Sequence, residues 1–245
     1  MRIIINADDC GYSTIVNEHI GRAISLRKIT STTVMANMQD LKGAKTLYDN
    51  FKDNISFGWH INLTEGSPLL YSQRLLDYGF YIEKEGEIVM NGKDFKNKLL
   101  TQAIRSEIEK ELTAQYQVLR DNGIIPSHID GHHHIHTSLW AMVILPSLLK
   151  KMKVECIRRI YNNMSNLPSL AARDLWAIYY KFHKMRMTEM FCSFSEYANN
   201  KIKKCELIEL ECHPGHPKYQ EEEKLLLETN FDEQSNVELV NYYII

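Results

Sequence analysis

Acidic and imidazole side chains follow four apolar stretches of this sequence, in each case where the stretch ends. Asp8 and Asp9 end one stretch, His60 ends another, a histidine-rich run beginning at His132 ends a third, and His213 follows a fourth. Stability alone gives little reason for this distribution. Because side chains of these types bind metal ions and transfer protons, we treat the positions as candidate functional residues.

Each of these signals has a structural alternative when it is taken singly. Adjacent acids such as Asp8 and Asp9 commonly form a turn or cap a helix. A single histidine in an apolar run, such as His60, is more often a hydrogen-bonded core residue than a metal ligand. The functional hypothesis therefore depends on the clusters meeting in space.

The histidine run is the strongest single signal. It is internal and follows an apolar stretch, which argues against an affinity tag. On an extended chain alternate residues face the same side, so His132, His134 and His136 would line one face while His133 points away. This arrangement favours metal binding, and the separate roles of His134 and His136 stay open.

Aspartate and histidine together suit zinc and similar borderline metals. Three protein ligands leave coordination positions for water and a substrate carbonyl. Of the two adjacent acids Asp8 and Asp9, one would bind the cation while the other takes a proton from water. His213, followed by Pro214 and Gly215 in a rigid turn, is suited to give a proton to a leaving group. The pattern indicates metal-assisted hydrolysis.

The elements that must position these residues alternate along the chain. Short apolar or β-branched stretches are separated by longer amphipathic ones, a pattern that predicts an α/β fold of mostly parallel strands with crossover helices. We expect about seven or eight such units in a barrel-like arrangement, a distorted TIM barrel, whose strands meet at one face by their carboxyl ends. The expected strands start at Arg2, Thr30, Ser56, Pro126, Glu155, near Phe191 and at Glu206, with NYYII as the last.

Two helices are clearly indicated between the strands. One begins after Ser13 as its N-cap, with Ile15, His19, Ile20, Ala23 and Ile24 marking one face. The longest spans residues 94–121.

Two further segments are less regular. Residues 66–92 lack a clear period, and we expect them to form a long excursion that walls a substrate site. For residues 165–200 a lid, a dimer surface and a buried helix are the alternatives. Their methionines and aromatic residues suit a lid or a dimer surface, which leaves a homodimer as an open alternative, but a buried helix is favoured.

Length and charge exclude several classes of protein. The chain has 245 residues, 44% of them hydrophobic and 24% charged, which predicts a single domain over residues 1–245 with a large core. The formal charge of −2 supplies no excess positive field for nucleic acid. The apolar N-terminal stretch is too short for a secretory signal, and the longest apolar run elsewhere falls below a membrane span of about 20 residues. We therefore expect a cytoplasmic protein without a membrane partner.

The cysteines argue against two further kinds of site. The five are odd in number and show no CxxC spacing, so neither a disulfide framework nor a thiolate zinc site is expected. They read as small buried or half-buried thiols.

Five motifs in order make the sequence resemble the YdjC-like carbohydrate deacetylases, the family that includes the chitooligosaccharide deacetylases. They are NADDCG, TSTTVMAN, GWHINLTEG, PSHIDGHHHIH and ECHPG, which together cover most of residues 1–140 and the region around His213. Residues 162–204 offer little to align. The resemblance implies a barrel-like α/β fold, one divalent metal ion and hydrolysis of an N-acetyl group from a sugar.

The resemblance also implies roles for individual residues. Asp9, His60 and His132 would bind the metal, Asp8 would be the catalytic base, and His213 would work opposite Asp8 as the acid. Mg²⁺ is the metal that the resemblance favours, with Zn²⁺, Mn²⁺ and Co²⁺ as alternatives.

Other positions match or depart from the family pattern. Asp130 would orient the metal-binding histidines. Gly131 stands where serine is expected and Cys10 where an aromatic residue is usual, although neither change removes a proposed ligand. Trp59 and Asn62 also vary the pattern, and we expect them to reshape the sugar pocket.

These observations favour a metal-dependent hydrolase that removes acetyl groups from N-acetylated sugars such as small chitin-derived oligosaccharides or their phosphates. One alternative is a metal-dependent phosphoesterase on a similar barrel, which would be expected to bind two metals with more carboxylates. The other is a non-catalytic sugar-binding or metal-binding protein. Asp8 and His213 argue against that alternative, because a pure binding site needs neither a free acid beside the metal nor a proton donor.

Overall fold

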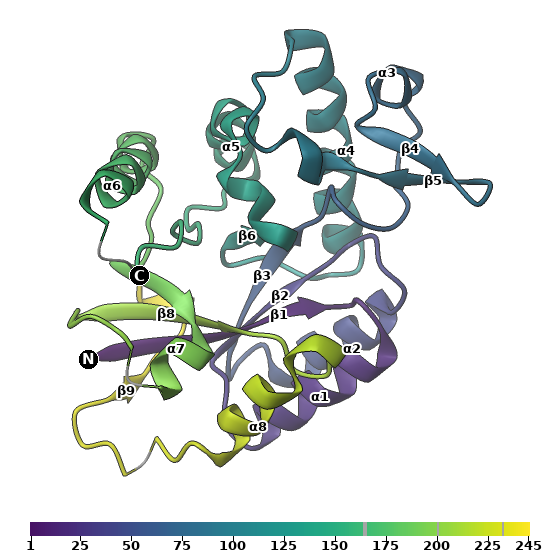
Figure 1. Ribbon diagram of the computed structural model, residues 1–245. Coiled ribbons are helices and arrows are strands. Elements are labelled where there is room, and N and C mark those ends of the chain that lie inside the picture. The colour runs from purple at the N-terminus through teal and green to yellow at the C-terminus, as the bar shows by residue number, and fades with distance from the viewer. Residues whose placement is uncertain (164–165, 200, 232) are drawn as a thin grey trace.

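A curled, mostly parallel sheet forms the centre of the protein and makes a half-barrel with helices between its strands (Figure 1). The computed structural model describes residues 1–163, 166–199, 201–231 and 233–245. The sheet runs β6-β3-β2-β1-β8-β7, with β9 beside β1, and its strands pair in parallel. Its strands are β1 Arg2–Cys10, β2 Ser31–Val34, β3 Ser56–Ile61, β6 Ile129–Gly131, β7 Met190–Ser193, β8 Leu207–Cys212 and β9 Glu238–Leu239. The predicted fold class is confirmed.

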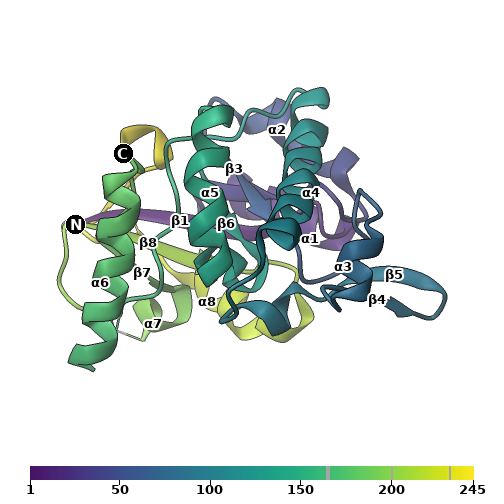
Figure 2. The same ribbon diagram turned by 90° about the horizontal axis from the view of Figure 1, so that it is seen from above.

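Helices connect the strands and cover the outside of the sheet. Figures 1 and 2 show α4, α5 and α6 in a row along one side. The helices are α1 Thr14–Ser25, α2 Leu41–Phe51, α3 Gln73–Asp77, α4 Gln102–Asp121, α5 Leu139–Met152, α6 Leu167–Phe182, α7 Phe194–Ala198 and α8 Gln220–Glu228. Short 3₁₀ turns are η1 Gly92–Phe95, η2 His132–Thr137, η3 Pro217–Tyr219 and η4 Tyr242–Ile244.

The first two helices that the sequence indicates are present, with corrections. The hydroxyl of Ser13 accepts a hydrogen bond from the backbone N–H of Val16 and caps α1, as expected. Ile15, however, is 61% exposed, and Val16 takes its place on the buried face of α1. The long helix begins at Gln102 and not at residue 94, because the hydroxyl of Thr101 caps it there and the preceding residues form η1.

Two expected strands are absent from the described structure. The stretch from Glu155 makes only isolated bridges, Ile157 to Ile129 and Cys156 to Arg186. The C-terminal NYYII forms the turn η4 and not a strand. The side chain of Asn241 accepts a hydrogen bond from the N–H of Tyr243, which turns the chain, and Tyr242 is buried in contact with Ser56 of β3 and Glu209 of β8.

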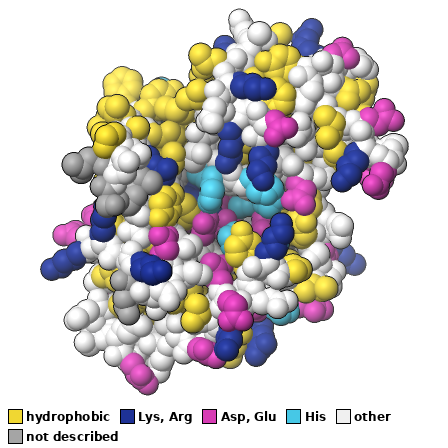
Figure 3. Space-filling model, in the orientation of Figure 1, with side chains coloured by type: hydrophobic (Ala, Val, Ile, Leu, Met, Phe, Trp, Pro, Cys, Tyr) yellow, Lys and Arg dark blue, Asp and Glu magenta, His cyan; other side chains and the backbone are white. Residues whose placement is uncertain are grey.

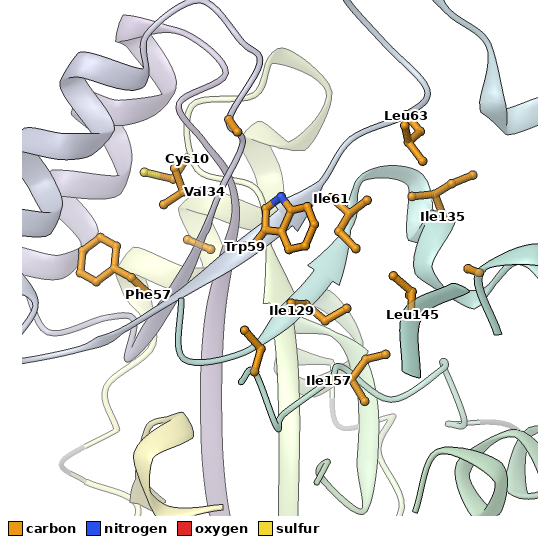
Figure 4. Packing of buried hydrophobic residues seen from close by; sticks show 14 of the residues in the cluster. Cys10, Val34, Phe57, Trp59, Ile61, Leu63, Ile129, Ile135, Leu145 and Ile157 are labelled. Carbon is orange, nitrogen blue, oxygen red and sulfur yellow. The ribbon is translucent and has the colours of Figure 1, made fainter. Parts of the chain in front are cut away.

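The core lies against the sheet and includes a residue that we expected in the sugar pocket. Figure 4 shows Trp59 among Phe57, Ile61 and Ile129, and the tryptophan is fully buried. Its ring lies 5.8 Å from that of Tyr116 on α4. The expectation that Trp59 shapes the pocket is therefore wrong, because this side of β3 faces the helices.

The two less regular segments of the sequence both contain regular elements. The excursion at residues 66–92 contains α3 and an antiparallel hairpin of β4 Tyr81–Lys84 and β5 Glu87–Met90. In α6, Trp176 and Tyr180 are buried, whereas Ile178 and Phe182 are exposed, so the helix is buried on one side only.

All five cysteines are free thiols, and four of them are buried, as expected. Within the described residues, none of the helices is both long and apolar enough to cross a membrane.

Candidate active site

The carboxyl ends of β1, β3, β6 and β8 meet around one pocket, as a parallel barrel requires. Figure 3 shows histidines and carboxylates gathered at the centre of this face, with lysine and arginine side chains close by. The pocket has a volume of about 270 Å³. It is lined by Asp8, Asp9, His60, Lys93, Gly131, His132, His133, His134, Glu211, His213, His216, Lys218 and Tyr219.

A bulge at the end of β1 brings two consecutive acids into this pocket. The register against β2 shifts between Ala7 and Cys10, which places an extra residue in β1. Asp9 takes a left-handed conformation there, with φ of 67°. In a regular strand Asp8 and Asp9 would face opposite sides, so the bulge is what allows both to line the pocket.

Asp9, His60 and His132 converge on one point. Oδ1 of Asp9 lies 3.1 Å from Nε2 of His60 and 2.9 Å from Nδ1 of His132. All three side chains are buried. Two ligands of one tetrahedral ion, each about 2.1 Å from it, lie roughly 3.4 Å apart, so these spacings suit a shared cation.

A carboxylate holds the outer nitrogen of each of the two histidines. Nδ1 of His60 lies 2.7 Å from Oδ1 of Asp130, and Nε2 of His132 lies 2.8 Å from Oε2 of Glu65. With the proton on these outer nitrogens, the inner nitrogens present lone pairs to Asp9. Such carboxylate contacts are typical of histidines that bind metals, because they select the tautomer and orient the ring.

The contacts between Asp9 and the inner nitrogens of His60 and His132 are short, but they are not hydrogen bonds. Oδ1 of Asp9 is buried and has no hydrogen-bond partner among the described residues, although two imidazole nitrogens lie near it. A carboxylate oxygen facing two nitrogen lone pairs repels them unless a positive charge lies between. The donor set therefore fits a divalent cation.

The same contacts explain the protonation of the site. Burial alone would lower the pKa of His60, but Asp130, followed by Asp9 and Asp8, raises it well above its usual value. Burial would raise the pKa of Asp9, but His132 and His60 hold it well below its usual range. A proton and a metal cation thus compete for one position.

Asp8 has a different partner. Its two oxygens accept hydrogen bonds of 2.6 Å from Nη1 and Nη2 of Arg158, a fully buried residue. Burial would raise the pKa of Asp8, but the charge and hydrogen bonds of Arg158 hold it well below its usual range. Asp8 is therefore an ionised carboxylate that contacts Arg158, whereas Asp9 contacts His60 and His132.

Arg158 was missed in the sequence because it lies in a stretch that resembled an ordinary strand. Besides Asp8, its Nη2 lies 2.9 Å from Oδ2 of Asp130. It thus joins the proposed base to the carboxylate that orients His60. A buried arginine in an apolar stretch was the available signal, since such a charge must be paired.

His213 follows β8 and lies in a turn that is held by two acids of α8. Oε1 of Glu222 accepts a hydrogen bond of 2.9 Å from the backbone N–H of His213 and lies 3.3 Å from its Nδ1. Glu223 accepts from the N–H of Gly215. Burial would lower the pKa of His213, but Glu222 and the charges of Asp8 and Glu211 raise it to about 9.

Glu211, at the end of β8, is a second residue that sequence reasoning missed. It lines the pocket 3.5 Å from Nη1 of Arg158 and 3.8 Å from Nε2 of His134. Burial, followed by the charge of Asp8, raises the pKa of Glu211 to about 8. In β8, Glu209 and Glu211 alternate with apolar residues, a pattern that predicts an ordinary solvent-facing side of a strand. Glu209 is nevertheless buried, so the pattern did not indicate that this side faces the interior.

The histidine run is not extended, which corrects the expected alternation. His133 and His134 both take left-handed conformations, with φ of 51° and 55°. Consequently His133 lines the pocket together with His134, and its Nδ1 lies 2.9 Å from Oγ1 of Thr64. His136 is buried beside Trp176 instead. Two adjacent left-handed residues are unusual outside glycine.

Asn62 shapes the site indirectly. Its Oδ1 accepts hydrogen bonds from the N–H groups of Thr64 and Glu65, and its Nδ2 donates to the Glu65 carbonyl. This turn presents Glu65 to His132. The hydroxyl of Tyr12 also donates to Glu65, at 2.9 Å.

Known proteins resemble this chain over most of its length. The family model described as YdjC-like protein matches residues 2–240. A carbohydrate deacetylase from Clostridium beijerinckii is 26% identical over 99% of this chain and 99% of its own. A carbohydrate deacetylase from Halalkalibacterium halodurans is 30% identical over 88% of this chain and 86% of its own.

Solved structures share the fold. A protein from Enterococcus faecalis that is named for cellobiose-phosphate cleavage superimposes with a TM-score of 0.76 at 20% identity, over 99% of this chain and 98% of its own. A lactam utilization protein from Thermus thermophilus gives 0.53 at 12% identity, over 98% and 99%. At these identities the likeness establishes the fold alone.

Proposed function

This chain belongs to the YdjC-like protein family, and we propose that it is a metal-dependent hydrolase that removes acetyl groups from N-acetylated sugars. Relatives that match nearly its whole length are named carbohydrate deacetylases. The observation that carries the proposal is the convergence of Asp9, His60 and His132, with the unpartnered Oδ1 of Asp9 at its centre.

The ligand set is Asp9, His60 and His132. A divalent cation held there supplies a Lewis acid that polarises the amide carbonyl and acidifies water. Asp130 and Glu65 contact the outer nitrogens of the two histidines and so aim the inner nitrogens at Asp9, where a cation would take the place of a proton. The chemistry of this set admits Mg²⁺, Zn²⁺, Mn²⁺ and Co²⁺, with Mg²⁺ favoured by the family resemblance.

Two residues carry the proton transfers. Asp8 takes a proton from the attacking water, and Arg158 keeps the carboxylate ionised and fixed in position. His213 donates a proton to the amine nitrogen as the C–N bond breaks, because Glu222 keeps the imidazole protonated at neutral pH. Because the pKa of Asp8 is lowered and that of His213 is raised, Asp8 is ionised and His213 is protonated at the same pH.

A phosphoesterase with two metals is less well supported. Asp8, Glu211 and His213 form a second group with atoms close enough to share an ion. Both oxygens of Asp8 already accept hydrogen bonds from Arg158, however, so a second cation on Asp8 would lie beside the positive charge of a buried guanidinium. The arrangement favours one metal.

The substrate that we propose is a short chitin-derived oligosaccharide. The test is acetate release from N-acetylated mono-, di- and trisaccharides, after chelation and after adding each of the four metals. Lys93 and Lys218 line the pocket, so phosphorylated disaccharides belong in the panel. Metal-dependent acetate release would support the proposal, whereas phosphate release without acetate would replace it with the phosphoesterase.

A further inference from the structure

The turn η4 packs against β3 and β8 through Tyr242. Tyr242 of η4 is buried, and its ring stacks on His128 with centroids 3.5 Å apart. Its hydroxyl donates a hydrogen bond to Oε2 of Glu209, which is fully buried on β8. The mechanism above uses neither Tyr242 nor Glu209.

Glu209 connects this turn to the proposed base. Its Oε1 accepts a hydrogen bond of 2.7 Å from Nε of Arg158. The other edge of the same guanidinium binds Asp8 through two hydrogen bonds of 2.6 Å. Tyr242, Glu209, Arg158 and Asp8 therefore form one continuous chain of contacts from the C-terminus to the pocket.

We propose that Tyr242 is a positioning residue for Asp8, acting through Glu209 and Arg158. This inference rests on the proposed function, because its effect is on turnover at the same site. A guanidinium is planar, so binding along both edges fixes the plane in which it meets Asp8. Without the tyrosine hydroxyl, one oxygen of the buried Glu209 carboxylate loses its donor, and the carboxylate can turn and release Nε of Arg158.

The test is Tyr242→Phe, which keeps the ring and its packing on His128 and removes only the hydroxyl. We expect kcat to fall about tenfold while KM and metal content stay within about twofold, because misplacing a reacting group lowers turnover more than binding. The matched control is Tyr243→Phe, at the next residue, which is 58% exposed and should leave all three unchanged. A kcat for Tyr242→Phe within about twofold of the wild type would overturn the proposal.

A second variant separates positioning from general stability. In a Glu209→Gln background Tyr242→Phe should have no further effect on kcat, because the contact that transmits it is already altered. Equal losses in both backgrounds would show that Tyr242 acts by another route.

A measurement independent of turnover covers the case in which the wild type releases no acetate. The Nε–H signal of Arg158 in a ¹⁵N spectrum is identified as the one absent from Arg158→Lys. We expect its hydrogen exchange to be faster in Tyr242→Phe than in the wild type and the Tyr243→Phe control. Unchanged exchange in Tyr242→Phe would refute the contact chain. If exchange is faster in Tyr242→Phe but the wild type releases no acetate, only the proposed function is refuted.

Discussion

At the scale of single residues, the site is defined by the partners of its histidines more than by the histidines themselves. His60 and His132 resemble each other in that each has one nitrogen toward Asp9 and the other on a carboxylate. His133, next in the chain, contacts a threonine hydroxyl instead. This difference predicts which histidines bind metal.

The first prediction concerns metal affinity. His132→Ala should lose the metal, and Glu65→Gln should weaken its binding by about 10- to 100-fold, because the amide no longer accepts the imidazole proton as a carboxylate does. His133→Ala is the matched control and should remain loaded. Metal content of the purified variants decides, and a loaded His132→Ala with an empty His133→Ala would reverse the assignment.

The second prediction separates turnover from metal binding. Asp8→Asn and His213→Gln should keep the metal and lose at least about 10²-fold in kcat, because each removes one proton transfer. Measuring metal content and kcat on the same preparations tests this. If Asp8→Asn lost the metal while Asp9→Asn kept it, the two acids would exchange roles.

The third prediction is the alkaline limb of the rate profile. The raised pKa of His213, about 9, means that the imidazole is protonated below that pH and loses its proton as pH rises through it. Activity should therefore fall on the alkaline side, and the positive charge of a bound cation would move this fall to lower pH. Because Glu222→Gln removes the charge beside His213, the limb of this variant should shift to lower pH. A profile of kcat/KM against pH with an unshifted limb would argue against His213 as the acid.

At the scale of elements, the site depends on irregular backbone where strands end. The bulge at Asp9 and the left-handed His133 and His134 each turn a side chain toward the pocket. The turn at Gly215 does the same for His213, since it has φ of 78° and is tied to Glu223 of α8.

The fourth prediction compares two glycines of similar conformation. Gly86 has φ of 82° with open space around it, whereas a Cβ on Gly215 would lie 3.0 Å from Val16 and His19 of α1. Gly86→Ala should cost about 1–2 kcal/mol of unfolding free energy from the left-handed backbone alone. Gly215→Ala should cost about 1–3 kcal/mol more, from overpacking, and should also lower kcat by displacing His213. Urea unfolding of both variants and their kcat values test this, and equal costs would contradict it.

At the scale of the whole molecule, the proposed ligands come from three strand ends far apart in the sequence. Asp9 lies near the end of β1, His60 lies on β3 and His132 follows β6. A cation bound by all three would therefore link strands across the sheet and bind the folded chain only.

The fifth prediction is thermal. A metal at about 100 times its dissociation constant should stabilise the fold by roughly 2.7 kcal/mol, because binding to the native state alone shifts the unfolding equilibrium. The melting temperature should rise with metal concentration in the wild type and not in His60→Ala. An equal rise in both proteins would place the effective cation elsewhere.

The sequence by itself determined the fold class, the family and the positions from which the site is built. Parallel strands bring their carboxyl ends to one face, so polar residues at strand ends could be grouped before their distances were known. The residue type of Ser13 also indicated the N-cap of α1 correctly. The expected C-terminal strand was wrong, because its β-propensity was overridden by the burial of Tyr242 against His128 and Glu209.

Only the tertiary structure decided which residues support the site. Arg158, Glu65, Glu211 and Glu222 belong to it through contacts with side chains distant in the sequence. Likewise, the bulge at Asp9 and the turn at His133 change which way neighbouring side chains face. Periodicity reports the side that a residue occupies on its own element, whereas the partner of a buried charge depends on which other element packs opposite it.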